Sequence, residues 1–457
     1  MNNWPRWLGQ AVILAGALAT PAMAETAAPT PPRDLSRLEH IVVIYLENHS
    51  FDNLFGKFPG ADGLAKAGRR AVQVDRDGQP YKTLPPVLDA STKPPQADPR
   101  FPPDLPNRPF PIDKYMSPEM KTPDLVHRYY QQQAQIDGGK MDKFVAYTNA
   151  GGLVMGYQDG SKLALWSYAR QYTLADHFFH AATGGSFLNH FWTICACTPR
   201  YDDAPDSLRA QLDPQGKLVK DGAVTPDGFA VNTLYSVYAP HPAKADTALL
   251  LPPQTLRTIG DALSEKGISW AWYSGGWNDA LAGKADPIFQ YHHQPFAYFE
   301  KYGDGTTGRQ EHLKDEGDLL AGLDRGALPA VVFWKPIGAL NEHPGYTDTL
   351  SGDRHMREVI EKIRKGPLWR STAIIVTYDE NGGFWDHVPP PKGDRWGPGI
   401  RVPAVIISPF AKRHYVDHTA YDTTSILRLI ETRFGLAALG ERDARAGNLL
   451  NAFDFRH

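Results

Sequence analysis

The chain has 457 residues, a hydrophobic share of 42% and a formal net charge of −3 at neutral pH. This length suffices for one large α/β domain with insertions or for two modest domains. The mildly acidic balance gives no reason to expect nucleic acid or an anionic membrane as a partner. With two cysteines, Cys195 and Cys197, the chain is not a disulfide scaffold, and their spacing fits a cramped bridge or two buried thiols equally well.

The first 24 residues have the pattern of a signal peptide. Arg6 precedes an apolar run over residues 11–19, and Ala22 to Ala24 give a small-x-small cleavage pattern. No other apolar run approaches membrane-spanning length, so we expect no stable membrane span and an exported, periplasmic or secreted protein. We expect a flexible leader at residues 25–35 and a single domain over residues 36–457.

The first half of the chain mixes a few regular elements with long polar stretches. An apolar strand is expected at residues 39–46. Residues 57–123 show little periodicity, which favours an insertion that runs over the site. Helical spacing predicts helices over residues 124–145 and 161–175, with His127 in the first turn of the former. A lone histidine at such a place is more often a surface or packing residue than a functional one.

Ser186 stands at the start of a further apolar helical run, directly after two glycines. Near a helix N-terminus, free backbone N–H groups and the helix dipole favour an anion. A serine there also suits an N-cap, and the two interpretations are compatible. The surrounding sequence is not a Gly-x-Ser-x-Gly elbow and no Asp-then-His order follows, so an α/β-hydrolase is not expected.

The second half alternates helices and strands. A polar, Pro-rich stretch at about 200–250 is expected to be a second insertion. After it, apolar patterns predict helices at residues 254–266, 354–364 and 423–434 and strands at 268–273, 328–334, 372–378 and 401–408. Such alternation predicts a largely parallel sheet with helices on both faces.

Carboxylates directly follow two of the predicted strands. Glu47 and Asn48 follow the N-terminal strand, and Asp379 and Glu380 follow the strand at 372–378. If these strands are parallel in one sheet, the four residues meet at its carboxyl edge, where α/β sheets bind ligands. Three carboxylates crowded with an amide oxygen repel unless a cation holds them, which predicts a divalent metal. Acids beside Asn and Gly also suit an ordinary solvated turn.

Histidines lie in two of the loops that follow strands. His292 and His293 stand in an aromatic loop, and His343 follows the predicted strand at 328–334. Paired histidines in an aromatic loop can be stacking residues, but they also suit phosphate contacts or proton transfer.

Two long motifs resemble the signatures of the bacterial acid phosphatase and phospholipase C family. Glu47–Gly56 (ENHSFDNLFG) is similar to the opening signature of that family, and Tyr378–Pro391 (YDENGGFWDHVPPP) is similar to the closing one. His49 stands where the family more usually has Arg. The resemblance covers essentially the whole mature chain, because shorter motifs match in order between the two signatures at Gly138–Asp142, Ser186–Asn189 and Glu342–Pro344.

The resemblance implies an alkaline-phosphatase-like fold, a three-layer α/β/α sandwich with a mostly parallel central sheet and loop insertions over the site. It implies a metal held by Glu47, Asn48, Asp379 and Glu380, with Ser186 as the nucleophile also bound to it. It places around the phosphoryl group His127, Asn189, His292, His293 and His343. The four oxygen ligands coincide with those expected from the strand ends, whereas Ser186 and the histidines rest mainly on the resemblance.

The implied activity is hydrolysis of phosphoric esters through a phosphoserine at Ser186. Asn189 and the helix N-terminus would stabilise the equatorial oxygens, and His343 or His127 would protonate the leaving oxygen. Oxygen ligands favour Ca²⁺, Mg²⁺ or Mn²⁺, while the nearby His343 keeps Zn²⁺ open. Several protonated histidines predict an acidic to near-neutral pH optimum.

We expect a broad-specificity phosphomonoesterase, with a phospholipase C that hydrolyses phosphatidylcholine as the alternative. Phospholipase C members of the family usually carry further C-terminal domains, whereas this chain ends soon after its last predicted helix. The His292–His293 pair also resembles the acid phosphatase branch. A binding protein of the same fold that has lost catalysis is less favoured, because every motif residue, Ser186 included, is present. The oligomeric state is not indicated by the sequence.

Overall fold

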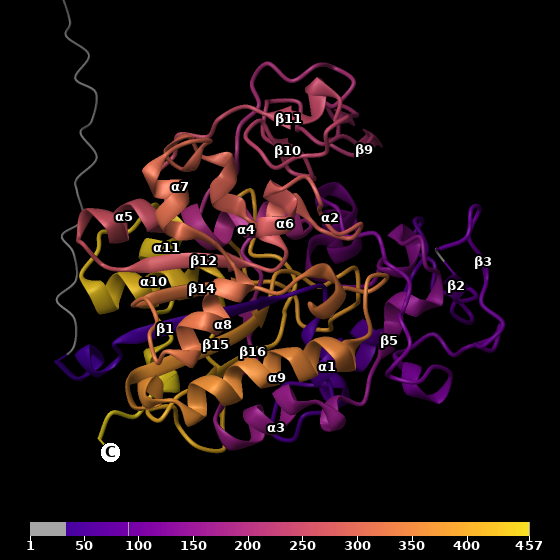
Figure 1. Cartoon of the computed structure of the whole chain (residues 1–457). Helices are drawn as coiled ribbons and strands as arrows, with labels where there is room; N and C mark the ends of the chain where they lie inside the picture. The colour runs from indigo at the N-terminus through magenta and orange to yellow at the C-terminus, as the bar shows by residue number, and fades with distance from the viewer. Residues whose placement is uncertain (1–32, 90, 457) are drawn as a thin grey trace, which may run out of the picture.

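The computed structural model describes residues 33–89 and 91–456, so the expected signal peptide and most of the expected leader lie outside the described residues. Its centre is an eight-stranded sheet in the order β13-β12-β14-β1-β15-β16-β6-β17 (Figure 1). The strands are β1 (His40–Leu46), β6 (Thr173–Ala175), β12 (Trp270–Ser274), β13 (Leu313–Asp315), β14 (Val331–Lys335), β15 (Thr372–Tyr378), β16 (Ala404–Ile407) and β17 (Tyr415–Asp417).

Five of the seven neighbouring strand pairs in this sheet run parallel. β1 lies between β14 and β15 and is parallel to both, with Leu46 opposite Tyr378 at its end. β16 runs antiparallel to both β15 and β6, and β6 is parallel to β17. Because β16 is antiparallel to the strand on either side of it, β6 and β17 point the same way as β1 and β15. The carboxyl ends of every strand except β16 therefore lie along one edge of the sheet.

The two central strands are buried on both faces. The sequences of β1 (HIVVIYL) and β15 (TAIIVTY) consist mainly of apolar and β-branched residues, and their apolar side chains belong to the main hydrophobic core. Continuous β-branched and apolar runs are typical of parallel strands that have helices on both faces. These strands make the carboxyl edge between them a rigid support for polar residues.

Helices cover both faces of the sheet, which confirms the predicted three-layer α/β/α architecture. In Figure 1, α3 (Ala164–Gln171), α8 (Glu316–Asp324) and α9 (Thr349–Lys365) lie on one side. On the other side lie α4 (Ser186–Cys195), α5 (Ile259–Glu265), α10 (Thr424–Phe434) and α11 (Glu441–Arg445). Shorter helices are α1 (Phe51–Phe55), α2 (Tyr129–Ile136), α6 (Trp277–Leu281) and α7 (Thr307–His312).

Two predicted helices are shorter than their patterns indicate. The expected helix over residues 124–145 is limited to α2, because Arg128 is extended before it and Asp137 takes a left-handed conformation after it. His127 therefore lies in an extended segment, and its predicted place in a helical first turn is wrong. The expected helix over 161–175 is likewise limited to α3, because residues from Thr173 onward pair with β16 and β17 as strand β6.

The long polar stretches form lobes of short strand pairs beside the sheet (Figure 1). Residues of the 57–123 stretch pack with Phe144, Val154 and Trp385 in a separate hydrophobic cluster. That both stretches are insertions in a single domain stays a prediction. The short strand pairs are β2 (Leu88–Asp89) with β3 (Gln96–Ala97), β4 (Phe110–Pro111) with β5 (Gly156–Tyr157), β7 (Phe178–Phe179) with β18 (Tyr421–Asp422), β8 (Gln211–Leu212) with β9 (Leu218–Lys220), and β10 (Tyr235–Ser236) with β11 (Leu250–Leu251).

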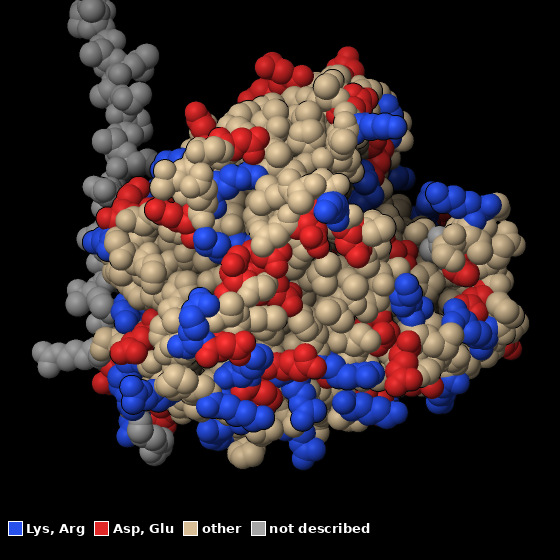
Figure 2. Space-filling model, in the orientation of Figure 1, with Lys and Arg blue, Asp and Glu red and all other residues tan. Residues whose placement is uncertain are grey.

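The surface carries charges of both signs. Figure 2 shows acidic and basic side chains interspersed over the visible face, without one broad field of a single sign. Among the described helices, none combines the length and the apolar character that crossing a membrane requires.

Candidate functional site

The site lies at the carboxyl edge of the two central strands. Glu47 and Asn48 follow β1, Asp379 and Glu380 follow β15, and all four side chains are fully buried. Because β1 and β15 pair to their last residues, the backbone N–H of Asn48 donates to Asp379 Oδ1 at 3.0 Å. The structure thus brings together the four oxygen-bearing residues that the sequence placed at one sheet edge.

Backbone turns hold these residues against each other. Asn48 has a positive φ of 64°, and Gly382 in the facing turn has a φ of 60°. A Cβ atom at Gly382 would lie 2.1 Å from the Asn48 carbonyl oxygen, so only glycine fits there. The acidic turn after β15 is therefore packed onto the turn after β1 and is not the solvated turn that the sequence alone allowed.

Ser186 is the first residue of helix α4 and faces this cluster. Its Oγ donates to Glu47 Oε2 at 3.0 Å and lies 3.3 Å from Asn48 Oδ1. The N-cap of α4 is Gly185, which has no capping side chain, so the interpretation of Ser186 as an N-cap is wrong. The hydroxyl is instead aimed at the carboxylates, beside the free N–H groups of the helix N-terminus.

The donor set fits a divalent cation. Asp379 Oδ2 and Glu380 Oε1 are buried and have no hydrogen-bond partner among the described residues. Burial, with Glu47 nearby, raises the pKa of Asp379 to about 7, and burial also raises the pKa of Glu380 well above its usual range. Unpaired carboxylate oxygens are costly in a buried site unless a cation compensates them. Oxygen ligands from carboxylates and an amide are those that hard divalent ions prefer.

Lys335 joins the site although the sequence analysis did not single it out. Its fully buried Nζ lies 2.6 Å from Glu47 Oε1 and donates to the Leu46 carbonyl oxygen at 3.2 Å. Burial raises the pKa of Glu47, but Lys335 and His293 outweigh it and hold that pKa well below its usual range. Glu47 is thus an anion with one oxygen on Lys335 and the other toward Ser186.

Four predicted histidines line a pocket of about 320 Å³ that opens over Ser186. His343 Nε2 lies 3.1 Å from Asn48 Nδ2, and the ring of His343 stacks on Tyr346 at a centroid distance of 3.8 Å. His127 Nε2 lies 3.8 Å from Glu380 Oε1. The four pocket histidines are His127, His292, His293 and His343.

The pKa values of these histidines move in opposite directions. Burial lowers the pKa of His127, but the Glu380 and Asp124 carboxylates outweigh it and raise the value to about 9. Burial lowers the pKa of His293 to about 4 and also lowers that of His292 and His343. Of the four, His127 is therefore the one suited to carry a proton at neutral pH.

A family comparison decides the class of protein to which this arrangement belongs. The model of the Phosphoesterase family matches residues 38–437, which is most of the chain. The chain belongs to the Phosphoesterase family. Its membership and its relatives identify it as a hydrolase of phosphoric esters.

Curated relatives of this phosphoesterase are bacterial phospholipases C. It is 26% identical to phospholipase C A of Mycobacterium tuberculosis over 93% of this chain and 78% of that protein. It is also 26% identical to the non-hemolytic phospholipase C of Burkholderia pseudomallei, over 97% of this chain and 62% of that protein.

Solved structures resemble the phosphoesterase distantly. An alkaline phosphatase superfamily protein from Vibrio parahaemolyticus has a TM-score of 0.35 and 11% identity, covering 64% of this chain and 65% of that one. Murine ectonucleotide pyrophosphatase/phosphodiesterase 5 has a TM-score of 0.36 and 10% identity, covering 64% of this chain and 95% of that one.

Asn189 of the phosphoesterase occupies a different position from the one expected. Its Oδ1 accepts from the backbone N–H of Ala182 at 3.0 Å, and its Nδ2 donates to the carbonyl oxygens of Ala182, Gly184 and Gly185. The side chain is fully buried and does not line the pocket. It braces the loop that carries Ser186, and a contact between Asn189 and phosphate stays a prediction that this arrangement does not favour.

Two more histidines of the phosphoesterase support the site from within the core. His190, which the sequence analysis did not select, places Nδ1 2.7 Å from the Ser186 carbonyl oxygen and stacks on His293 at 5.1 Å. His49 places Nδ1 2.6 Å from Asn53 Oδ1 and Nε2 3.1 Å from the Glu342 carbonyl oxygen. Spacing could have revealed His190, which lies one helical turn after Ser186.

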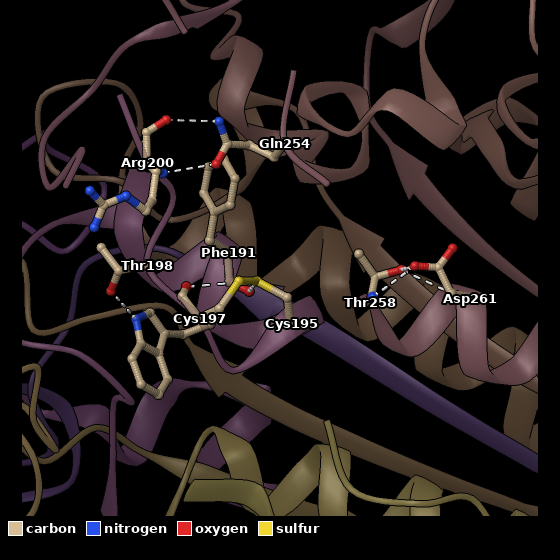
Figure 3. Close-up of a disulfide and its surroundings, with 9 residues drawn as sticks. Phe191, Cys195, Cys197, Thr198, Arg200, Gln254, Thr258 and Asp261 are labelled. Atoms are coloured by element: carbon tan, nitrogen blue, oxygen red, sulfur yellow. Dashed lines mark hydrogen bonds between the residues drawn. A yellow bond between two sulfur atoms is a disulfide. The ribbon is translucent and has the colours of Figure 1, made fainter. Parts of the chain in front are cut away.

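The end of helix α4 opposite Ser186 is followed by the disulfide Cys195–Cys197, so the two cysteines form a bridge and are not two buried thiols (Figure 3). Next to it, Trp192 Nε1 donates to Thr198 Oγ1 at 3.1 Å. Figure 3 also shows Gln254 bonded to both the backbone N–H and the carbonyl oxygen of Arg200. α4 is thus fixed at the end opposite Ser186.

Proposed function

We propose that the protein is a metal-dependent phosphomonoesterase that works through a phosphoserine at Ser186. The observation that carries this proposal is the position of Ser186 Oγ, 3.0 Å from Glu47 Oε2 and 3.3 Å from Asn48 Oδ1, two of the residues that cluster with Asp379 and Glu380 at the sheet edge. A hydroxyl at a helix N-terminus within an anionic oxygen cluster fits a nucleophile that a cation activates.

The residues that would hold the metal are Glu47, Asn48, Ser186, Asp379 and Glu380. A bound divalent cation would supply positive charge that offsets the carboxylates, favours the ionised serine hydroxyl and balances charge on the phosphoryl group. The all-oxygen donor set favours Ca²⁺, Mg²⁺ or Mn²⁺, and the imidazole of His343 near Asn48 keeps Zn²⁺ as a candidate.

The protein's own groups divide the remaining work. Ser186 Oγ, which would already be ionised with the metal bound, forms a bond to phosphorus while the bond to the leaving oxygen breaks, and it would be released in the same ionised form at the end of the cycle. His127 delivers a proton to that oxygen, which is consistent with its raised pKa and its position on the pocket wall. Water then forms the new bond to phosphorus, the Ser186 ester bond breaks, and the proton lost by that water restores His127.

The size of the pocket favours a small substrate. About 320 Å³ of polar, histidine-lined space suits a phosphoryl group with a modest leaving group. A neighbouring pocket of about 720 Å³ shares Val126 and Asn149 with it and offers room for a larger leaving group. The phospholipase C relatives favour the second candidate function, hydrolysis of a phosphodiester such as phosphatidylcholine.

Export is part of the same proposal. The signal-peptide pattern of the first 24 residues is the observation that supports a periplasmic or secreted enzyme. Cleavage after Ala24 is tested by N-terminal sequencing of the protein recovered from the periplasm or the medium of an expressing bacterium. A mature protein that still begins at Met1 contradicts it.

The experiment that tests the activity is a paired assay with p-nitrophenyl phosphate and p-nitrophenylphosphorylcholine, across pH, with and without chelator. Monoester turnover that disappears on chelation and returns with a divalent metal is the expected result. A preference for the phosphorylcholine diester would replace the phosphomonoesterase with the phospholipase C candidate. No turnover of either substrate would overturn the proposal.

A further inference from the structure

Two edge strands of the sheet end beside each other, away from the nucleophile. β6 is followed directly by Asp176 and His177, and β17 is followed by His418. The strands pair in parallel with Ala175 opposite Asp417, and the Asp176 N–H donates to the Asp417 carbonyl oxygen at 3.1 Å. The register therefore places these three side chains side by side at the same sheet edge as Ser186.

The three side chains converge on one point. Asp176 is fully buried, and His177 Nδ1 lies 2.9 Å from its Oδ1. His418 Nδ1 lies 3.0 Å from Oδ1 and 2.9 Å from Oδ2 of the same carboxylate. One donor atom from each residue lies within 4.8 Å of the others. In a tetrahedral zinc site with bonds near 2 Å, ligand atoms are about 3.3 Å apart, so a small outward shift of these rings admits an ion.

A further carboxylate orients this group. Asp62 Oδ2 lies 3.3 Å from His177 Nε2, and the Asp62 N–H donates to Asp176 Oδ2 at 2.7 Å. A carboxylate that accepts from one nitrogen of a histidine leaves the other nitrogen free to bind a metal, an arrangement common behind zinc-bound histidines. Asp62 also lies 3.3 Å from His387 Nε2, which fixes it from the other side.

Charge balance favours a cation at this point. In the described part of the chain, Asp176 forms ion pairs with His177 and His418 and with no lysine or arginine. The guanidinium of Arg401 pairs with Asp52 and Asp386, and its hydrogen bond to Asp176 goes to the backbone carbonyl oxygen and not to the carboxylate. Among the described residues, the buried carboxylate of Asp176 is therefore paired with imidazoles alone.

We propose that Asp176, His177 and His418 form a second metal site, for a transition-metal ion such as Zn²⁺. Two imidazoles and a carboxylate are a common ligand set for zinc, and three protein ligands leave a fourth position for water. The His418 side chain is 57% exposed, which gives an ion access from solvent. None of the three residues lines the catalytic pocket, so the ion clamps the ends of β6 and β17 to the Asp62 segment and takes no part in ester hydrolysis.

The test counts metal ions in the full mature protein. Chelator-treated protein is dialysed against Zn²⁺, and bound zinc is measured by atomic emission for wild type, the double variant His177→Asn/His418→Asn and the control His414→Asn. His414 lies on the same segment, bonds only to a backbone carbonyl oxygen and has a positive φ that asparagine tolerates. We expect the double variant to bind one zinc fewer than wild type, and the control to bind as many.

Substitutions in the catalytic cluster separate this site from the proposed function. Asp379→Asn/Glu380→Gln is expected to lose catalytic metal and turnover but to keep the zinc held by His177 and His418. Co²⁺ gives a second readout, since a four-coordinate site with two imidazoles shows visible absorption that the double variant lacks. Equal zinc content and equal Co²⁺ absorption in wild type and the His177/His418 variant would mean that these histidines only pair with Asp176, and would overturn the proposal.

If the double variant does not fold, the single variant His418→Asn replaces it in the comparison of zinc content with wild type. Because the His418 side chain is half-exposed, its substitution is expected to leave the fold intact.

Discussion

The two polar clusters at the carboxyl edge of the sheet are built alike but differ in chemistry. Around Ser186, the acids that follow β1 and β15 are fully buried, and Asp379 Oδ2 and Glu380 Oε1 have no hydrogen-bond partner among the described residues. Around Asp176, the acid that follows β6 is buried, but the imidazoles facing it reach the surface. Parallel strand ends thus gather candidate metal ligands in both places.

What distinguishes the two clusters is a nucleophile and a pocket. Ser186 stands at a helix N-terminus with about 320 Å³ of space before it, whereas Asp176, His177 and His418 do not line that pocket. A metal in the first cluster can take part in a reaction, and a metal in the second can only stabilise the fold. Changes in the first cluster are therefore expected to affect turnover, and changes in the second to affect metal content.

The largest effect is expected from Ser186→Ala. Without the hydroxyl no phosphoserine forms, so turnover of p-nitrophenyl phosphate is expected to fall by at least about 10³-fold. The fold is expected to stay close to wild type and metal binding to weaken only in part, because four of the five proposed ligands remain. Ser167→Ala, on an exposed helix face, serves as the control. Full turnover by Ser186→Ala would remove the assigned nucleophile.

Lys335→Met tests the buried ion pair that holds Glu47. Removing the lysine leaves the Glu47 carboxylate, at 0% exposure, without its lysine partner and with only His293 and Ser186 beside it, and such a loss lowers the free energy of unfolding by about 3 kcal/mol. Urea unfolding measures this change, with Lys365→Met on the surface as the matched control. An unchanged midpoint would mean that Glu47 does not depend on Lys335.

Glu380→Gln tests whether the unpaired carboxylates hold the metal. Substituting a residue that only hydrogen-bonds to a metal ligand lowers metal affinity by roughly 10- to 100-fold. Because Glu380 would be a ligand itself, we expect a larger loss of metal affinity and a matching loss of turnover. The metal-free variant is expected to melt at a higher temperature than the metal-free wild type, because one crowded carboxylate is gone. The surface change Glu358→Gln is the control. Wild-type metal affinity in Glu380→Gln would contradict the assignment.

The pH dependence of the metal-free protein follows from Asp379. Burial raises its pKa to about 7, above the value of about 3.9 in an unfolded chain, so the folded state favours the neutral form. This contribution to stability is complete below about pH 4 and is lost as the pH rises through about 7. Chelator-treated wild type is therefore expected to lose more Tm between about pH 5.5 and about pH 8 than Asp379→Asn does. Equal losses in the two proteins would contradict it.

The smallest effect on turnover is expected from His418→Asn. This half-exposed side chain does not line the catalytic pocket, so turnover is expected to stay within about twofold of wild type. Steady-state kinetics on both p-nitrophenyl substrates measure it. A large loss of turnover would tie the two clusters together and end the distinction between them.

The sequence was most informative where elements are long and buried. β1 and β15 have seven residues each, and their apolar runs predicted both the strands and the meeting of Glu47 with Asp379. Lys335 was missed because the predicted strand ended one residue short of it, at Trp334. His127 was selected by resemblance, and it does line the pocket. Its local structure was predicted wrongly, because the residues with helical spacing that follow it form only the short helix α2, which begins after His127.

The second cluster could not be predicted from periodicity. β6 and β17 have three residues each, too few to show an alternating pattern. The residues of β6 were included in the helix predicted over 161–175. Their pairing depends on residues about 240 positions apart in the sequence, such as Asp176 and His418. Long-range pairing of short strands is decided by tertiary packing, and only the structure places these side chains together.

The most direct test of the central claim is to trap the intermediate. Metal-loaded wild type is mixed with p-nitrophenyl phosphate and quenched in acid within the first turnovers, and its peptides are analysed by mass spectrometry. We expect phosphate on the peptide that carries Ser186, and none in the Ser186→Ala protein. Phosphate on another residue, or no phosphopeptide in an enzyme that turns the substrate over, would contradict nucleophilic attack by Ser186.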